Sequence, residues 1–155
     1  MPAVRGHPAR SYLLVKASGY PNDMTQVTRI LLVTGRRDQE SATHHALTRP
    51  DFETVAVPDV TAAYTRLLDS IFDLIVIEST EPPSGSIEFI KRVRATQQLA
   101  GILILILAEW GTGEPTLALS AGADAYEPNE IQPIDPKRLV TSIERLLHRQ
   151  VAAAN

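Results

Sequence analysis

The sequence predicts an α/β fold in which a parallel five-stranded sheet lies between two layers of helices. Three observations support this fold. Runs rich in Leu, Ile and Val recur five times along the chain and are typical of strands buried on both faces. Segments with helical periodicity or helix-capping residues separate these runs. Strict alternation of strand and helix favours parallel strands joined by right-handed crossovers, with helices on both faces of the sheet.

The first strand follows a stretch of different character. Residues 1–27 are expected to form a loosely ordered extension, because Met1–Gly19 contains several prolines and glycines. Arg29–Val33 is the first strongly aliphatic run and predicts a buried strand. Asp38 can then cap a helix that ends near Leu47.

The middle of the chain supplies two strands and the helix between them. Phe52–Val57 alternates and is rich in β-branched residues, which predicts a strand. Asp59 can cap the next helix. The expected buried face of that helix consists of apolar residues at helical spacing: Ala63, Leu67, Leu68 and Ile71. The third strand is expected over Leu74–Glu78 and ends in a carboxylate.

The following region repeats the alternation. A third helix is expected to bury Phe89, Ile90 and Val93, and Ile102–Leu107 predicts the fourth strand. A short helix from Thr112 to Ala121 precedes a fifth strand over Ala123–Glu127, since threonine caps helices well and proline suits their first turn.

The last helix completes the pattern. It begins at Asp135–Pro136 and runs to Gln150, which leaves residues 151–155 as a tail. Its apolar face consists of Leu139, Ile143, Leu146 and Leu147. For five such strands the common arrangement is the flavodoxin-like order 2-1-3-4-5, in which sites lie at the carboxyl ends of the strands. Glu78, at the end of the third strand, therefore marks the expected site.

The composition is that of one globular domain, because 155 residues allow a sizeable core but not two ordinary domains. The net charge of −3 offers no basic field for nucleic acid or an anionic membrane. The longest apolar run, Ile102–Ala108, is too short to span a bilayer. The absence of cysteine excludes disulfides and thiolate metal sites and leads us to expect a cytoplasmic protein.

Several short motifs occur in a familiar order. They are Ile30–Val33, Asp73–Ile77, Pro82 four residues after Glu78, Gly122–Tyr126 and Pro133–Pro136. With these motifs at this spacing, residues 28–150 resemble the receiver domain of two-component response regulators. The resemblance covers about four-fifths of the chain and implies a receiver fold.

The resemblance also implies positions for a phosphorylation site. Receivers accept a phosphoryl group on an aspartate after the third strand, and they use Mg²⁺ held by carboxylates, a lysine, a hydroxyl group and an aromatic residue. In this sequence the acceptor falls on Glu78, the acidic pair on Thr34 and Gly35, the hydroxyl on Ala108, the lysine on Gln132 and the aromatic on Tyr126. Only the aromatic residue is retained.

These replacements remove the parts that phosphoryl transfer needs. A glutamate displaces its carboxylate by one methylene, and a displacement of ~1 Å can cost ~10²-fold in rate. A metal ion that neutralises the transferred charge contributes several kcal/mol, and Thr34 and Gly35 supply no carboxylate for it. We therefore expect a pseudo-receiver: a non-catalytic signalling module without metal or cofactor, not phosphorylated in the usual Mg²⁺-dependent way.

The expected output is binding to another signalling protein in or beside a two-component pathway. By resemblance, the surface formed by the fourth helix, fifth strand and last helix is the candidate interface, and a homodimer through it is plausible. The candidate residues on this surface are Leu119, Tyr126, Lys137, Arg138 and Glu144, and Trp110 near the site is a candidate partner anchor.

Alternatives remain open at this point. Glu78 could mimic a charged, phosphorylated acceptor or could simply pair with Arg36 or Arg37. The chain could instead be a receiver phosphorylated by an atypical route, or a flavodoxin-like enzyme or cofactor carrier that uses the same crevice. His44 and His45 resemble a metal pair, but adjacent helical residues point about 100° apart, which favours a solvated helix face.

Overall fold

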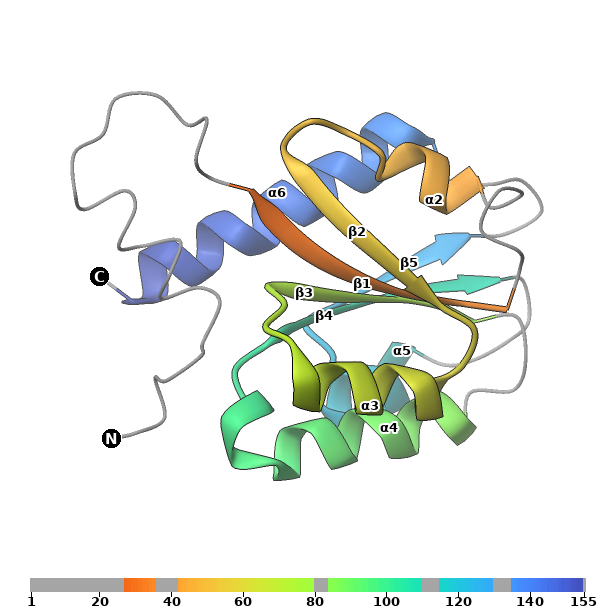
Figure 1. Cartoon of the computed structure of the whole chain (residues 1–155), viewed down its shortest axis with the longest axis vertical. Coiled ribbons are helices and arrows are strands. Elements are labelled where there is room, and N and C mark those ends of the chain that lie inside the picture. The colour runs from red at the N-terminus through yellow and green to blue at the C-terminus, as the bar shows by residue number, and fades with distance from the viewer. Residues whose placement is uncertain (1–26, 36–41, 80–83, 110–114, 130–134, 155) are drawn as a thin grey trace.

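The computed structural model describes residues 27–35, 42–79, 84–109, 115–129 and 135–154. It confirms the predicted fold: a five-stranded parallel sheet has the order β2-β1-β3-β4-β5, with helices on both faces (Figure 1). The strands are β1 (Thr28–Thr34), β2 (Phe52–Val57), β3 (Leu74–Ser79), β4 (Leu103–Glu109) and β5 (Ala125–Asn129). The predicted N-terminal extension lies outside the described residues, except for Val27.

The helices form two layers. Helices α2 (Ala42–Ala46) and α6 (Pro136–Ala154) cover one face of the sheet, and α3 (Val60–Asp69), α4 (Ser84–Ala95) and α5 (Pro115–Ala121) cover the other (Figure 1). A short 3-10 helix, η2 (Gln97–Leu99), follows α4. Because every strand is parallel to its neighbours, all five carboxyl ends lie at the same edge of the sheet.

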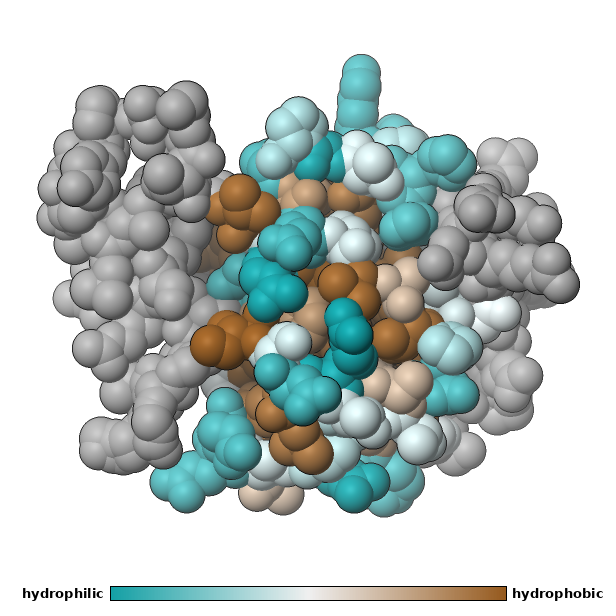
Figure 2. Space-filling model, in the orientation of Figure 1, coloured by the Kyte–Doolittle hydropathy of each residue, from teal (hydrophilic) through white to brown (hydrophobic). Residues whose placement is uncertain are grey.

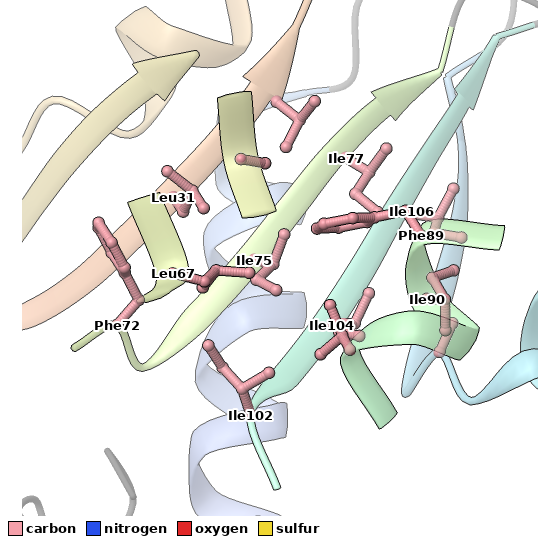
Figure 3. Close-up of a cluster of buried hydrophobic side chains, with 14 of the residues drawn as sticks. Leu31, Leu67, Phe72, Ile75, Ile77, Phe89, Ile90, Ile102, Ile104 and Ile106 are labelled. Carbon is pink, nitrogen blue, oxygen red and sulfur yellow. The ribbon is translucent and has the colours of Figure 1, made fainter. Parts of the chain in front are cut away.

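Alternation along each strand divides the core into two clusters. One cluster packs against α3, α4 and α5 and includes Leu31, Ile75 and Ile104 (Figure 3). The other packs against α2 and α6 and includes Leu32 and Val76. Since successive side chains of a strand point to opposite faces, a residue's position along its strand decides which helix layer it meets.

The helix boundaries confirm several predictions. Asp59 caps α3, and its carboxylate accepts a hydrogen bond of 2.8 Å from the Ala62 amide. Pro136 begins α6, and Leu139, Ile143 and Leu146 are buried against the sheet. The last helix continues to Ala154, four residues beyond the predicted boundary at Gln150. The capping role predicted for Asp38 and the helix start at Thr112 lie outside the described residues.

The predicted buried face of α3 is partly wrong. Ala63 and Leu67 are buried, but Leu68 and Ile71 are each 53% exposed. The helix ends at Asp69, so Ile71 lies beyond it, and Leu68 points about 100° away from Leu67 around the helix axis. Phe72, which is 1% exposed, fills the core between α3 and β3 instead.

The open edge of the sheet at β2 faces the viewer in Figure 1. Figure 2 shows the same side, where hydrophobic residues are interspersed with hydrophilic ones. Thr54, Val55 and Ala56 of β2 are only partly buried, whereas the middle of β1 and β3 is fully enclosed. The central strands are therefore the most deeply buried part of the sheet, and they carry the site described below.

Arg94 joins three segments at the end of the sheet opposite the site. Its guanidinium donates hydrogen bonds to the carbonyl groups of Gly122, Ala100 and Ile102, at 2.6–2.9 Å. It also forms an ion pair of 2.9 Å with Asp124, whose carboxylate accepts a hydrogen bond from the Ile104 amide. This single side chain thus connects the end of α4 to the start of β4 and to the turn before β5.

Asp73 performs a similar role just before β3. Its carboxylate accepts a hydrogen bond of 2.7 Å from the Arg29 amide, which ties the start of β3 to β1. Burial raises the pKa of the Asp73 carboxyl above its ordinary value, although the hydrogen bond and the positive charge of Arg29 oppose this rise. Folding therefore favours the protonated form relative to the unfolded chain.

We expect the Asp73→Asn variant to reveal this linkage. The stability that depends on protonated Asp73 is present below its unfolded-state pKa and is lost as the pH rises through its folded-state pKa. Urea unfolding of both proteins at about pH 7 and about pH 4.5 should therefore show the wild type gaining stability relative to Asp73→Asn at the lower pH. A difference that is independent of pH, or that grows the other way, would contradict the assignment.

Candidate functional site

The site is built on a row of side chains at the carboxyl edge of the sheet. Strand pairing aligns Thr34 with Glu78, Glu78 with Leu107, and Leu107 with Glu127. In each strand, the residue two positions earlier belongs to or packs against the core cluster that meets α2 and α6. Because side chains alternate along a strand, the residues of this row point to the same face as that cluster. The predicted site carboxylate therefore points toward the α2–α6 layer.

Glu78 is a buried carboxylate held by hydroxyl groups. It is 7% exposed, and its Oε1 accepts a hydrogen bond of 2.8 Å from Thr34 Oγ1. Its Oε2 accepts another of 2.8 Å from Thr43 Oγ1, in the first turn of α2. Hydrogen bonds to a charged acceptor are about twice as strong as neutral ones, so these contacts connect β1, β3 and α2 firmly.

Thr43 was missed by the sequence analysis. It is 2% exposed and lies 35 residues from Glu78 in the chain. The only local signal was a threonine next to His44 and His45, of which His44 is partly buried and His45 is exposed. A buried polar side chain needs a hydrogen-bond partner, and here that partner comes from a distant strand.

A second carboxylate in the same row was also missed as a site residue. Glu127, on β5, accepts hydrogen bonds from Ser142 Oγ at 2.8 Å and from Arg138 Nη2 at 3.0 Å. Ser142 and Arg138 belong to α6. Each helix of the α2–α6 layer is thus attached to the carboxyl edge of the sheet through one glutamate.

The described residues do not fit a magnesium ion. Mg²⁺ prefers oxygen ligands supplied by carboxylates. Thr34, the last residue of β1, pairs with Glu78 and is followed by Gly35, so neither position supplies a carboxylate. Within the part of the chain that the structure describes, no group of three or more His, Asp and Glu could hold a metal ion. Asp38, Arg36 and Arg37 lie outside the described residues.

The remaining positions implied by the resemblance are separated by the sheet. Ala108 is buried in the cluster that meets α3, α4 and α5, and Tyr126 packs against that same cluster. Tyr126 pairs with Ile106 across β4 and β5. These two positions therefore lie on the face opposite the Glu78 carboxylate, while Gln132 and Trp110 lie outside the described residues.

The residues of the predicted interaction surface fall into different places. Leu119 on α5 is 47% exposed, and Arg138 pairs with Glu127 beside β5. Lys137 and Glu144 instead line a groove of about 870 Å³ between α2 and α6, together with His45 and Arg49 of the α2 segment. The two halves of the predicted surface thus lie on different sides of α6.

Comparisons with known proteins agree with this architecture. No protein-family model matches the sequence. The chain is 26% identical over 124 residues to the response regulator ArlR of Staphylococcus aureus (strain Mu50), a match that covers 80% of this chain and 54% of ArlR. The chain therefore spans about half the length of the curated relatives that it matches.

Solved structures of similar fold include two receivers. The chemotaxis response regulator CheY4 of Vibrio cholerae superposes with a TM-score of 0.65 at 22% identity, over 77% of this chain and 98% of CheY4. A CheY-like receiver domain protein of Methanospirillum hungatei gives a TM-score of 0.67 at 21% identity, over 80% of this chain and 96% of that protein.

The described helices give no sign of a membrane span, since none of them is both long and apolar enough to cross a bilayer. The sheet order and the similarity to ArlR agree with each other. The chain has the fold of CheY-like receivers and is similar in sequence to the response regulator ArlR.

Proposed function

We propose that this chain is a pseudo-receiver, a module that acts in or beside a two-component pathway by binding another signalling protein. In this proposal Glu78 is not phosphorylated by the Mg²⁺-dependent route. The observation that carries it is the buried Glu78 carboxylate, whose two oxygens each accept a hydrogen bond of 2.8 Å from a threonine hydroxyl.

Two physical arguments support this reading. A nucleophilic carboxylate must be accessible to the incoming phosphorus, whereas Glu78 is 7% exposed and both of its oxygens are held by threonine hydroxyls inside the protein. The developing charge must also be offset by a metal ion or by cations, and Thr34 and Gly35 offer no charged ligand at the end of β1. Positioning and electrostatics supply nearly all of the catalysis in this chemistry, so their loss together removes it.

The test is a phosphorylation assay read by mass. The protein is incubated with Mg²⁺ and a small phosphodonor such as acetyl phosphate or phosphoramidate, and its intact mass is then measured. We expect no phosphate adduct, while a receiver with a complete acidic site, treated in parallel, is modified. A stoichiometric adduct on this chain would reject the proposal.

The Glu78→Asp variant provides the matched control. It restores the length of the usual acceptor side chain but not the metal carboxylates, so we expect it to remain unmodified as well. An adduct on Glu78→Asp alone would show that one methylene, and not the missing metal ligands, explains the lost activity.

The proposed partner is another signalling protein, and a second copy of this chain is one candidate. Exposed residues near β5 that suit such contacts are Leu119 and, at the start of α6, Arg138. Sedimentation velocity over a range of concentrations distinguishes a homodimer from a monomer that binds a different protein.

A further inference from the structure

The site at the end of β3 contacts only one of the two helix layers through the hydrogen bonds described. Thr43 of α2 donates to Glu78, and Ser142 and Arg138 of α6 donate to Glu127. Leu107 lies between the two glutamates in the same row of the sheet. The two carboxylates therefore act on the same layer, each through a different helix.

The opposite face of the sheet is apolar at the end of β4. Ala108, the residue of β4 nearest the site on that face, presents a methyl group to the cluster beneath α3, α4 and α5. A methyl group transmits packing but no directed hydrogen bond, so the Ala108 side chain itself offers no polar link between Glu78 and Tyr126. On the α2 side, by contrast, a single hydrogen bond from Thr43 joins Glu78 directly to the helix.

The two attachments also flank a groove. The groove of about 870 Å³ between α2 and α6 is lined by Ala46 and Thr48 on one side and by Val140, Thr141 and Glu144 on the other. The described part of helix α2 comprises five residues, and isolated helices of this length are unstable in water. Its position must therefore depend on tertiary contacts, of which Thr43–Glu78 and the buried Leu47 are two.

We propose that Glu78 is a conformational anchor for α2, so that the state of this carboxylate sets the position of α2 and the width of the α2–α6 groove. The α5–β5 face does not respond to it. This goes beyond the proposed function, because it states which surface of the module changes when the site is altered.

The test compares Thr43→Val, Thr43→Ser and the wild type by residue-resolved amide hydrogen exchange. Valine keeps the shape of threonine but removes the donor, and serine keeps the donor. In Thr43→Val we expect the Leu47 and Thr48 amides, which close the end of α2, to exchange about tenfold faster or more, because one hydrogen bond to a buried charge is lost. Thr43→Ser should restore most of their protection.

Two further variants make the test specific. Glu78→Gln should accelerate the same amides less, since an amide still forms hydrogen bonds but carries no charge; it also carries the test if Thr43→Val does not fold. Ser142→Ala, which removes the hydroxyl that holds Glu127, should affect α6 and leave the Leu47 and Thr48 amides unchanged.

Amides on the opposite face decide the outcome. The Gly122 and Ala123 amides, which bond to the end of α5, should keep their wild-type exchange rates in Thr43→Val and Glu78→Gln. Equal acceleration at these amides and at α2 would indicate general destabilisation and overturn the proposal. Unchanged exchange at Leu47 and Thr48 would overturn it as well.

Discussion

Replacing Arg94 with methionine should lower the free energy of unfolding by about 3 kcal/mol, although the residue lies far from the site. The guanidinium supplies hydrogen bonds to three backbone carbonyl groups and to the Asp124 carboxylate. The side chain is only 22% exposed, so water can replace these donors only in part. Methionine retains apolar contacts of similar length but offers no donor, which leaves Asp124 half-buried without its cation.

The measurement is urea unfolding followed by circular dichroism, with Arg92→Met as the matched control. Arg92 lies in the same helix and stacks over the Tyr64 ring at 4.1 Å, but it is exposed. Its replacement should cost about 1 kcal/mol or less, the usual range for an exposed cation–π contact. Equal losses in the two variants would show that the Arg94 contacts contribute little beyond helix α4 itself.

Arg94 also explains why Gly122 has no side chain. Gly122 has a φ of 126°, in a region that favours glycine, and a Cβ atom there would lie 2.8 Å from Arg94 Cγ. The turn before β5 thus needs both a left-handed backbone and space for the arginine stem. Gly122 was part of the motif that suggested a receiver, and its physical role is to accommodate this contact.

The sequence sufficed to predict the strands and helices, because these follow from local patterns, and the spatial order of the strands then followed from the arrangement common to five alternating strands. Aliphatic runs, capping residues and alternation each depend on a few consecutive residues, and Asp59 and Pro136 confirm that such signals place helix starts well. The contacts that define the site depend instead on distant partners. Thr43 and Glu78 are 35 residues apart in the sequence, and Arg94 and Asp124 are 30 residues apart. No pattern of neighbouring residues could therefore predict either contact.

Helical spacing alone also failed at one point, and the failure has a clear cause. Leu68 and Ile71 continue the apolar spacing of α3, but Ser70 has an extended backbone, which ends the helix. The apolar spacing in the sequence therefore continues beyond the last residue of the helix, Asp69. The position of Glu78 was predicted correctly at the end of β3, whereas the face to which it points required the register of the sheet.

Replacing Ile75 with alanine should lower the free energy of unfolding by about 3–4 kcal/mol. Ile75 is fully buried at the middle of β3, the central strand, and it lies among the side chains of β1, β4 and the helices beneath them (Figure 3). The loss combines the transfer free energy of the missing carbons with the cavity that they leave between rigid strands. Ile75→Val removes only one methylene and should cost about 0.5–1.5 kcal/mol.

Leu119→Ala is the informative comparison, because it removes a leucine of which 47% is exposed on α5. Unfolding in urea should change by no more than about 0.5 kcal/mol for this surface position. A variant with so small a change in stability stays folded. Any loss of self-association or partner binding in Leu119→Ala would therefore result from the altered surface and not from unfolding. A cost similar to that of Ile75→Ala would mean that α5 is packed more deeply than its exposure indicates, and Leu119 would then no longer serve as a probe of the proposed interface.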